Sequence, residues 1–534
     1  MLSSVYAAFQ AVATTAPAQP FLHLVADTAR RYGMPSGELS YGEALERIER
    51  LIRAHAAAGA RSGQRVALAL DNRPAYFLHW LALNALGVSV VPLNADWQAA
   101  ELEYVLEHSG ATSVICLRER CDNVLPTATA LGLRVWIAGD AWESAGTQAA
   151  PAGQRDDTEC ALLYTSGTTG RPKGCMLSNA YFLSSGQWYL DIGGYCALKP
   201  GEDRLITPLP MYHMNAMAVS TMAMILTGGC VVPLDRFHPD SWWDSVRESR
   251  ATIIHYLGVM PVMLMGLPAQ AADRNHHVRF GFGAGLSGEL HRGFEARFGF
   301  PLIEAWAMTE TGCSVAVIAN HEPRKVGTAC FGRPPDHLDY RLVDENGNDV
   351  AAGQPGELLV RRRGADPRYG LFSGYLKDDA ATQAAWAGGY FHTGDLVRLD
   401  EDGLFHFVDR RKNVIRRSGE NISAVEVEQV LLEVPGVRSV AVAAVPDAVR
   451  GDEVCACVVS DVAASSWPEL VDALVEHSLH RLAYYKAPGY VVRCEALPLT
   501  ATEKIQRGAL KTLAAERVAA GDCTDTRARK VRRG

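Results

Sequence analysis

The strongest constraint on the fold is an alternation of strand-like and helix-like segments along most of the chain. An apolar run at 64–70 predicts a strand, the amphipathic segment 73–87 predicts a helix, and the apolar run at 88–93 predicts a second strand. Further strand-like runs lie at 111–117, 134–139, 228–234, 251–257 and 301–306. Strands separated by helices usually pair in parallel, so the pattern predicts an α/β protein with largely parallel sheets.

Two changes of pattern divide the 534 residues further. After Gly327, short apolar runs joined by Asn-Gly and Pro-Gly turns at 332–362 predict a small antiparallel β unit. After a charged cluster at 409–421, two helix-like and three strand-like runs predict a compact α+β segment. The expected organisation is a large N-terminal α/β domain carrying the β unit (1–411), a small α+β domain (412–520) and a basic, disordered tail (521–534).

Charge and cysteine usage limit the partners and the compartment. A net charge of −8 gives no general attraction for nucleic acid or an anionic membrane. The basic end, which includes Arg527, Arg529 and Lys530, is expected to be solvated, with a binding arm as the alternative. The twelve cysteines are scattered without a C-x-x-C pair, which is typical of reduced thiols in a cytosolic protein.

The N-terminus lacks the positively charged start of a secretory signal. The apolar stretch 77–93 contains His79, Asn84 and Gly87, so it predicts a helix followed by a strand and not a membrane span. We therefore expect a soluble cytoplasmic protein with no membrane span and no nucleic-acid partner. A homodimer is a reasonable expectation for such a protein.

A loop rich in hydroxyls and glycines is the clearest chemical feature. Between 165 and 174 the chain supplies four hydroxyls, three glycines and a lysine. Phosphate oxygens are bound by such hydroxyls, by backbone N–H groups that glycine leaves accessible, and by a cation. It is not a Walker A loop, because the lysine precedes a glycine and not Ser or Thr. The residues that we expect to bind phosphate are Thr165, Ser166, Gly167, Thr168, Thr169, Gly170 and Lys173.

This loop resembles the phosphate loop of the adenylate-forming superfamily, and the resemblance extends over nearly the whole chain. The segment 306–310 resembles the family's aromatic-Gly-x-Thr-Glu motif, with Ala307 at the usual glycine position. The resemblance implies that Trp306 stacks on adenine, that Thr309 contacts the α-phosphate, and that Glu310 holds Mg²⁺. It assigns Ala307 and Met308 to the nucleotide site as well.

The glycine-rich segment 283–288 also satisfies G-x-G-x-x-G, with Glu304 about twenty residues on, as in a dinucleotide-binding fold. A single match of this kind is weak evidence. The resemblance favours another role, in which Gly283, Ala284 and Gly285 form one wall of the adenine pocket.

The later motifs occur in the family's order. The resemblance implies that Asp395, in Thr-Gly-Asp, and Arg410 contact the ribose, and that Lys412 is the hinge of a mobile C-terminal domain. It places Gly419 at the pantetheine tunnel of coenzyme A. Lys504 matches the family's catalytic lysine for adenylation. By the same resemblance, Lys173, Thr309 and Glu310 are the other catalytic residues.

These residues predict an AMP-forming carboxylic acid–CoA ligase that uses ATP, Mg²⁺ and coenzyme A. The segment 208–216 lacks the acidic residue with which amino-acid adenylation domains hold the substrate ammonium. It resembles the P-x-x-H segment of acyl-CoA synthetases. By that match His213 borders the acyl pocket, although a buried core histidine is the alternative. The acid is expected to be aliphatic or crotonobetaine-like. Two other functions stay open, an enzyme that loads a carrier protein and a nucleotide-binding regulator without catalysis.

Overall fold

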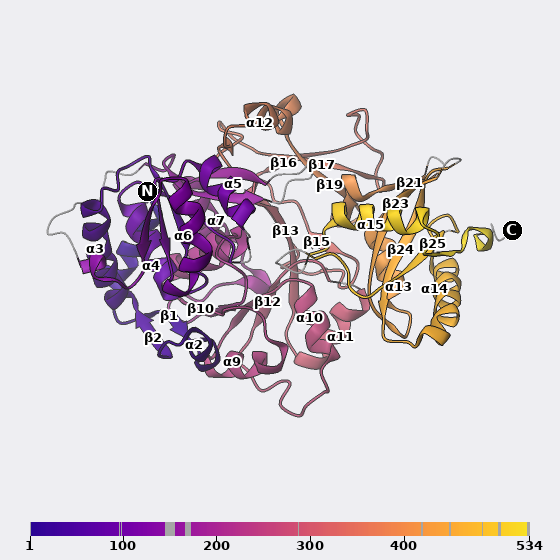
Figure 1. Ribbon diagram of the computed structural model, residues 1–534, viewed down its shortest axis with the longest axis horizontal. Coiled ribbons are helices and arrows are strands. Elements are labelled where there is room, and N and C mark those ends of the chain that lie inside the picture. Colours follow the sequence, from indigo (N-terminus) through magenta and orange to yellow (C-terminus); the bar gives the residue numbers. More distant parts are fainter. Residues whose placement is uncertain are drawn as a thin grey trace. The chain divides into compact units, whose positions relative to one another are not determined.

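The computed structural model describes residues 2–95, 97, 99–144, 155–165, 172–286, 288–417, 420–447, 450–482, 484–499 and 504–530. Two compact units make up the chain, and Figure 1 labels their elements. Unit 1 comprises Met1–Tyr340 and Val360–Phe391, and unit 2 comprises Arg341–Leu359 and His392–Gly534.

The first sheet of unit 1 has seven strands in the order β18-β8-β7-β4-β3-β5-β6. Its central strands β7, β4, β3, β5 and β6 pair in parallel, whereas β8 and β18 add antiparallel partners at one edge. Leu102 and Val105 of α5 pack with Val114 of β5 in one apolar cluster. The bounds are β3 (Arg65–Ala69), β4 (Ser89–Pro92), β5 (Ser113–Cys116), β6 (Arg134–Ile137), β7 (Glu159–Thr165), β8 (Lys173–Ser178), β18 (Gly374–Tyr375), α5 (Ala99–Ser109) and α6 (Cys121–Ala130).

The second sheet of unit 1 has eight strands in the order β14-β13-β12-β11-β9-β10-β1-β2. Among the described strands of this sheet, only the pairs at its two edges, β13–β14 and β1–β2, are antiparallel. The α/β prediction with largely parallel sheets is therefore confirmed. The strands are β1 (Pro20–Leu24), β2 (Gly37–Ser40), β9 (Arg204–Thr207), β10 (Cys230–Pro233), β11 (Ile253–His255), β12 (Phe280–Gly283), β13 (Leu302–Met308) and β14 (Gly312–Ile318).

Two helices of unit 1 bear on the sequence predictions. Helix α3 (Tyr41–Ala57) starts with a capping box, in which Ser40 and Glu43 satisfy each other's backbone N–H groups. Helix α4 (Pro74–Ala85) is buried from Tyr76 to Ala85 on every side, so the prediction of an amphipathic helix there is wrong. Its apolar residues surround the axis because other elements cover all of its faces. Other helices include α1 (Val5–Thr15), α7 (Asn179–Asp191), α8 (Thr221–Thr227), α10 (Val259–Gly266) and α11 (Gly288–Phe298).

Unit 2 contains most of the expected antiparallel β unit and the C-terminal α+β segment. Strands β16 (Leu338–Val343), β17 (Pro355–Arg362), β19 (Phe391–Leu399) and β20 (Phe405–Arg410) are neighbours in one sheet, and the division between the units falls within β16 and β17. A second sheet contains β21 (Ile415–Arg417), β22 (Glu420–Ile422), β23 (Val437–Asp447), β24 (Gly451–Ser460), β25 (Tyr490–Cys494) and β26 (Thr524–Asp525).

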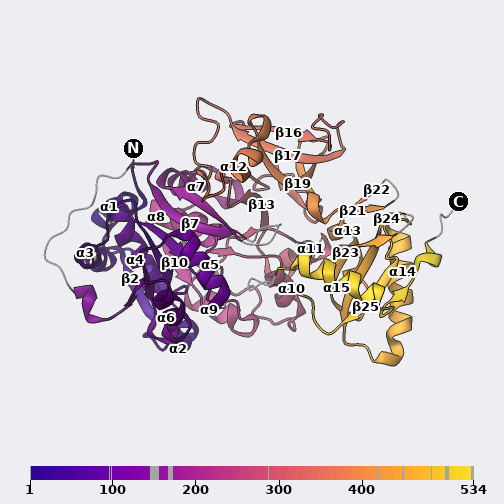
Figure 2. The ribbon, with the colours of Figure 1, turned by 45° about the horizontal axis from the view of Figure 1, so that its top comes forward.

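The two faces of this second sheet are covered by different helices (Figure 2). Val440 and Val442 of β23 pack with α13 (Ala424–Leu432) and α14 (Trp467–Arg481). The intervening Ala441 and Ala443 pack with α15 (Arg507–Ala519). The period of two along the strand therefore divides the core into two layers.

The tail differs from the expectation. Residues 521–530 were expected to be disordered, yet they form β26 and a short helical turn at Arg527–Arg529. Basic side chains of this segment form ion pairs with carboxylates; Arg527, for example, pairs with Asp447 and Asp525. Each of the twelve cysteines is a free thiol. Within the described ranges, no helix is long and apolar enough to cross a membrane.

Candidate active site

The predicted phosphate loop joins two antiparallel strands. β7 ends at Thr165 and β8 begins at Lys173, and these two residues are paired across the strands. The Thr165 hydroxyl also donates to the Lys173 carbonyl at 3.5 Å. Ser166, Gly167, Thr168, Thr169 and Gly170 lie outside the described residues. The structure thus brings the two ends of the loop together and places Lys173 at its base.

Lys173 and Glu310 are linked through a residue that the sequence analysis did not single out. The Tyr375 hydroxyl donates to Glu310 Oε1 at 2.9 Å, and Lys173 Nζ lies 4.8 Å from the centre of the Tyr375 ring. Burial and the neighbouring Glu310 charge raise the pKa of Tyr375, so its hydroxyl stays protonated and donates. Lys173 Nζ also lies 3.7 Å from Asp378 Oδ2. A cation and a carboxylate are therefore held around one aromatic ring.

Glu310 lies in the turn between β13 and β14, where the backbone is held from several directions. The Tyr181 hydroxyl donates to the Thr309 carbonyl at 2.9 Å, and the Phe372 N–H donates to the Glu310 carbonyl at 2.9 Å. Met308 N–H donates to the Thr311 hydroxyl at 2.9 Å. These bonds fix the Thr-Glu segment on a rigid strand end, as a site that orients a ligand requires.

Trp306 is a buried residue of β13, and its ring lies 6.3 Å from that of Phe331. Ala307, Met308 and Thr309 are partly exposed. Adenine stacking on Trp306 stays a prediction.

Close packing requires a glycine at 283, and a left-handed backbone conformation favours one at 285. A Cβ on Gly283 would lie 2.4 Å from the Tyr256 carbonyl oxygen, and Gly285 has a φ of +88°. Ala284 and Gly285 are exposed at the end of β12. The surface of this wall is therefore formed by backbone and a single methyl group, which lets a flat ligand approach closely.

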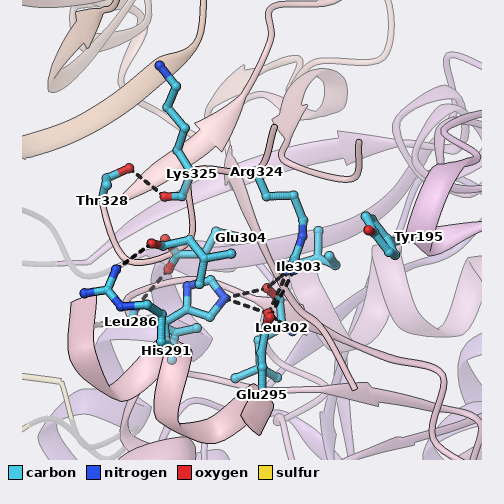
Figure 3. A network of polar contacts seen from close by, with 12 residues as sticks. Tyr195, Leu286, His291, Glu295, Leu302, Ile303, Glu304, Arg324, Lys325 and Thr328 are labelled. Carbon is cyan, nitrogen blue, oxygen red and sulfur yellow. Dashed lines mark hydrogen bonds and ion pairs between the residues drawn. The ribbon is translucent and has the colours of Figure 1, made fainter. Parts of the chain in front are cut away.

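Glu304 holds this glycine-rich segment in place, whereas the sequence offered it only as the acidic residue of a dinucleotide fingerprint. Its residue pairs with Gly283 across β12 and β13, and its Oε1 accepts the Leu286 N–H at 2.9 Å (Figure 3). The Gly285 N–H provides a further backbone bond. Burial, opposed by these bonds, raises the pKa of Glu304. The Glu304 carboxylate is buried and accepts hydrogen bonds from the loop itself. Glu304 therefore does not serve as the ribose ligand of a dinucleotide fingerprint.

A second carboxylate, that of Glu295 in α11, is hydrogen-bonded near the start of β13. Arg324 pairs with Glu295 at 2.7 Å, and the His291 ring contacts both Glu295 and the Leu302 carbonyl (Figure 3). Burial of Glu295 favours a higher pKa for its carboxyl. Hydrogen bonds from His291, Arg324 and the Leu302 backbone outweigh burial and lower this pKa to about 2. The network ties α11 to β13.

His213 precedes a π-helical turn, Asn215–Ser220, and is partly buried with its ring against Tyr212. His255, which was not predicted, is fully buried beside this turn. Its two ring nitrogens contact the Tyr189 hydroxyl at 3.0 Å and the Ser220 hydroxyl at 2.8 Å. Burial lowers the pKa of His255 to about 3, so this ring is neutral.

In unit 2, the Thr-Gly-Asp motif begins at the start of β19. Asp395 pairs with Arg410 across β19 and β20, and its Oδ1 lies 2.6 Å from Arg410 Nε. The Thr393 hydroxyl donates to the Leu358 carbonyl at 2.6 Å and accepts the Asp395 N–H at 3.0 Å. The structure therefore brings both predicted ribose ligands together.

Of the remaining predicted residues of unit 2, the structure describes Lys412 and Lys504. Lys412 lies in the turn Arg411–Asn413, and Gly419 is outside the described residues. Lys504 is exposed and precedes Ile505, which bridges to Leu499. Desolvation by surrounding atoms and then repulsion from Arg410 lower the pKa of Lys504. Arg410 thus interacts electrostatically with two predicted site residues.

Comparisons with known proteins identify relatives of this chain. The model of the AMP-binding enzyme family matches residues 9–376, and that of the AMP-binding enzyme C-terminal domain matches residues 426–504. A crotonobetaine/carnitine–CoA ligase of Citrobacter koseri is 30% identical over 493 residues, which cover 89% of this chain and 93% of the relative. The protein of that name from Salmonella typhi is 30% identical over 494 residues, with the same shares covered.

Solved structures resemble the chain over most of its length. ATP-bound MatB from Rhodopseudomonas palustris is 26% identical, with a TM-score of 0.82 and coverage of 95% of this chain and 98% of that one. o-Succinylbenzoate CoA synthetase from Bacillus subtilis, in complex with its acyl-adenylate, is 24% identical and shares the fold, with a TM-score of 0.81 and coverage of 94% and 97%.

Proposed function

Because this chain belongs to the AMP-binding enzyme family, whose model matches residues 9–376, we propose that it is an ATP-dependent carboxylic acid–CoA ligase. In the first step a carboxylate oxygen bonds to the α-phosphorus of ATP and pyrophosphate leaves. In the second step the thiolate of coenzyme A bonds to the acyl carbon and AMP leaves with the bonding electrons. AMP is a far better leaving group than oxide, which is why the acid is activated first.

The arrangement of Lys173, Tyr375 and Glu310 supports the phosphate part of this proposal most directly. Lys173 supplies a cation at the base of the hydroxyl-rich loop, and Glu310 supplies a buried carboxylate held by Tyr375. The attacking carboxylate and the triphosphate are both anions, so their approach needs fixed positive charge. The β7–β8 pair fixes the backbone of Lys173 at the base of the loop.

The residues around Glu310 fit a Mg²⁺ ion that ATP brings with it. Among the described residues, no group of three or more His, Cys, Asp or Glu could hold a metal ion alone. Mg²⁺ commonly takes one or two protein carboxylates and completes its shell with phosphate oxygens and water. Glu310 would hold it, and the ion would neutralise phosphate charge.

Unit 2 supplies the remaining roles. Asp395 and Arg410 would bind the ribose, and Lys504 would bring a cation to the carboxylate and the α-phosphate during adenylation. We place the functional boundary at Lys412, between 1–411 and 412–520, with Lys412 as the hinge and Gly419 at the thiol arm of coenzyme A. The match of a separate C-terminal domain model to residues 426–504 supports this boundary.

The acid is aliphatic or crotonobetaine-like, as the names of the relatives that cover most of this chain suggest. His213 would border the acyl group. The methionines nearby contribute mainly to the core, since Met217, Met222 and Met224 are fully buried. A substrate with a compact polar end is therefore a better first choice than a long hydrocarbon chain.

The test is release of AMP and pyrophosphate from ATP–Mg²⁺ over a panel of acids, with and without coenzyme A. The panel contains crotonobetaine, carnitine, malonate, butyrate, octanoate and benzoate. AMP formation that depends on coenzyme A with one class of acids supports the proposal. Pyrophosphate release that stays near stoichiometric despite coenzyme A points to a carrier protein, and silence over the panel points to a regulator. Glu310→Gln should abolish turnover, whereas Glu46→Gln, an exposed carboxylate on α3, should not.

A further inference from the structure

The C-terminal segment 524–530 is bound to the body of unit 2. β26 pairs antiparallel with β25, with Asp525 opposite Tyr490. Next to it, Thr526 is buried; its N–H donates to the Gly489 carbonyl at 2.9 Å and its hydroxyl donates to the Pro488 carbonyl at 2.6 Å. This backbone pairing holds the segment in one register on the sheet.

Lys530 ends the segment in a buried ion-pair network. Its Nζ lies 2.5 Å from Glu453 Oε1, and the two side chains are 1% and 0% exposed. Arg417 approaches the same carboxylate at 2.9 Å and is itself 6% exposed. Burial, opposed by Glu453 and reinforced by Arg417, lowers the pKa of Lys530 to about 8, so the ammonium stays charged at neutral pH.

The space around Glu453 is tightly filled. A Cβ on Gly489 would lie 2.5 Å from the Glu453 side chain, so this carboxylate packs directly against the backbone that leads into β25. Buried ion pairs add little net stability compared with apolar packing, because desolvation offsets their attraction. What they fix is geometry, since each charged group requires its partner at one place.

Arg417 connects this network to a hairpin. It is the last residue of β21, and it is paired with Glu420 of β22 and with Gly451 of β24. The Glu453 carboxylate therefore pairs both with Arg417 of β21 and with Lys530 of the C-terminal segment.

We infer that Lys530 is a positioning residue for the coenzyme A step. Through Glu453 and Arg417 it fixes the strand pair β21–β22, whose strands flank Gly419 in the sequence, and so sets how the thiol arm is received. The inference rests on the proposed function, which assigns Gly419 to coenzyme A. It gives the basic C-terminus a role inside the enzyme.

The experiment separates the two half-reactions in the full-length enzyme with an acid that the panel identifies. Adenylation is measured by ATP–pyrophosphate exchange, and thioester formation by supplying the acyl-adenylate and varying coenzyme A. Lys530→Met should raise the KM for coenzyme A roughly tenfold, which corresponds to about 1.4 kcal/mol of weaker binding. Exchange should stay within about twofold of wild type, because Lys504 and its surroundings are intact.

Two comparisons keep the test decisive. Arg529→Ala removes an exposed pair with Asp472 in the same segment and should change neither half-reaction. A chain ending at Gly521 should reproduce the effect of Lys530→Met. An unchanged KM for coenzyme A in both altered enzymes would overturn the inference, and so would an equal fall of both half-reactions. Failure of the wild type to form a thioester from supplied adenylate would instead refute the proposed acceptor.

Discussion

Replacing Glu304 by leucine removes the acceptor of the Leu286 and Gly285 N–H groups at the glycine-rich wall. Gly285 is exposed, so water can replace its partner, whereas Leu286 is 3% exposed and its N–H would be left unsatisfied. An unsatisfied buried donor costs about 1–3 kcal/mol. If this cost falls on the geometry of the nucleotide site, the KM for ATP should rise by roughly 5- to 150-fold.

Glu304→Gln is the matched variant, because the amide keeps an acceptor oxygen and loses only the charge. We expect its KM for ATP to rise by about fivefold, which corresponds to roughly 1 kcal/mol. The KM for the acid should change less than twofold in both variants. Steady-state kinetics of each variant measures both KM values, and thermal unfolding of each variant checks that it is folded. Equal ATP KM values for wild type and Glu304→Leu would refute the reasoning.

The raised pKa of Glu304 also predicts a pH dependence of stability. Its pKa is higher in the folded than in the unfolded chain, so its contribution is fully present below the unfolded value of about 4.3. The contribution is lost as pH rises through the folded value. The stability of wild type relative to Glu304→Gln should therefore be greatest at acid pH and decline on the way to neutral pH. A difference that grows with pH would contradict the assigned shift.

Three further predictions concern unit 2. Lys504→Ala should abolish adenylation yet still convert supplied acyl-adenylate to thioester, and an equal loss of both steps would contradict this division of roles. Lys412→Pro fixes φ at the proposed hinge and should spare adenylation while stopping thioester formation, so normal turnover would exclude the hinge. Asp395→Ala should raise the KM for ATP roughly 10- to 100-fold by removing charged hydrogen bonds. It should also abolish any preference for ATP over 2′-deoxy-ATP, and a preference that survives would exclude the ribose role.

Local patterns in the sequence predicted much of the architecture. The runs at 64–70 and 88–93 became β3 and β4, with α4 between them. These strands and the helix follow from periodicity and turn chemistry, which act over a few residues. The family resemblance implied that Asp395 and Arg410 act together, and the register of β19 and β20 makes them neighbours.

Other features depended on contacts between distant parts of the chain. Tyr375 reaches Glu310 because β18 pairs with β8, and no spacing in the sequence indicates that contact. Which elements cover the several faces of α4 is likewise decided by contacts between distant parts of the chain. Lys530 looked like part of a solvated tail, because its partner Glu453 lies 77 residues away. The sequence by itself determined the elements and the chemical groups. The tertiary structure decided which charges are buried together, because burial and pairing depend on every neighbour in space.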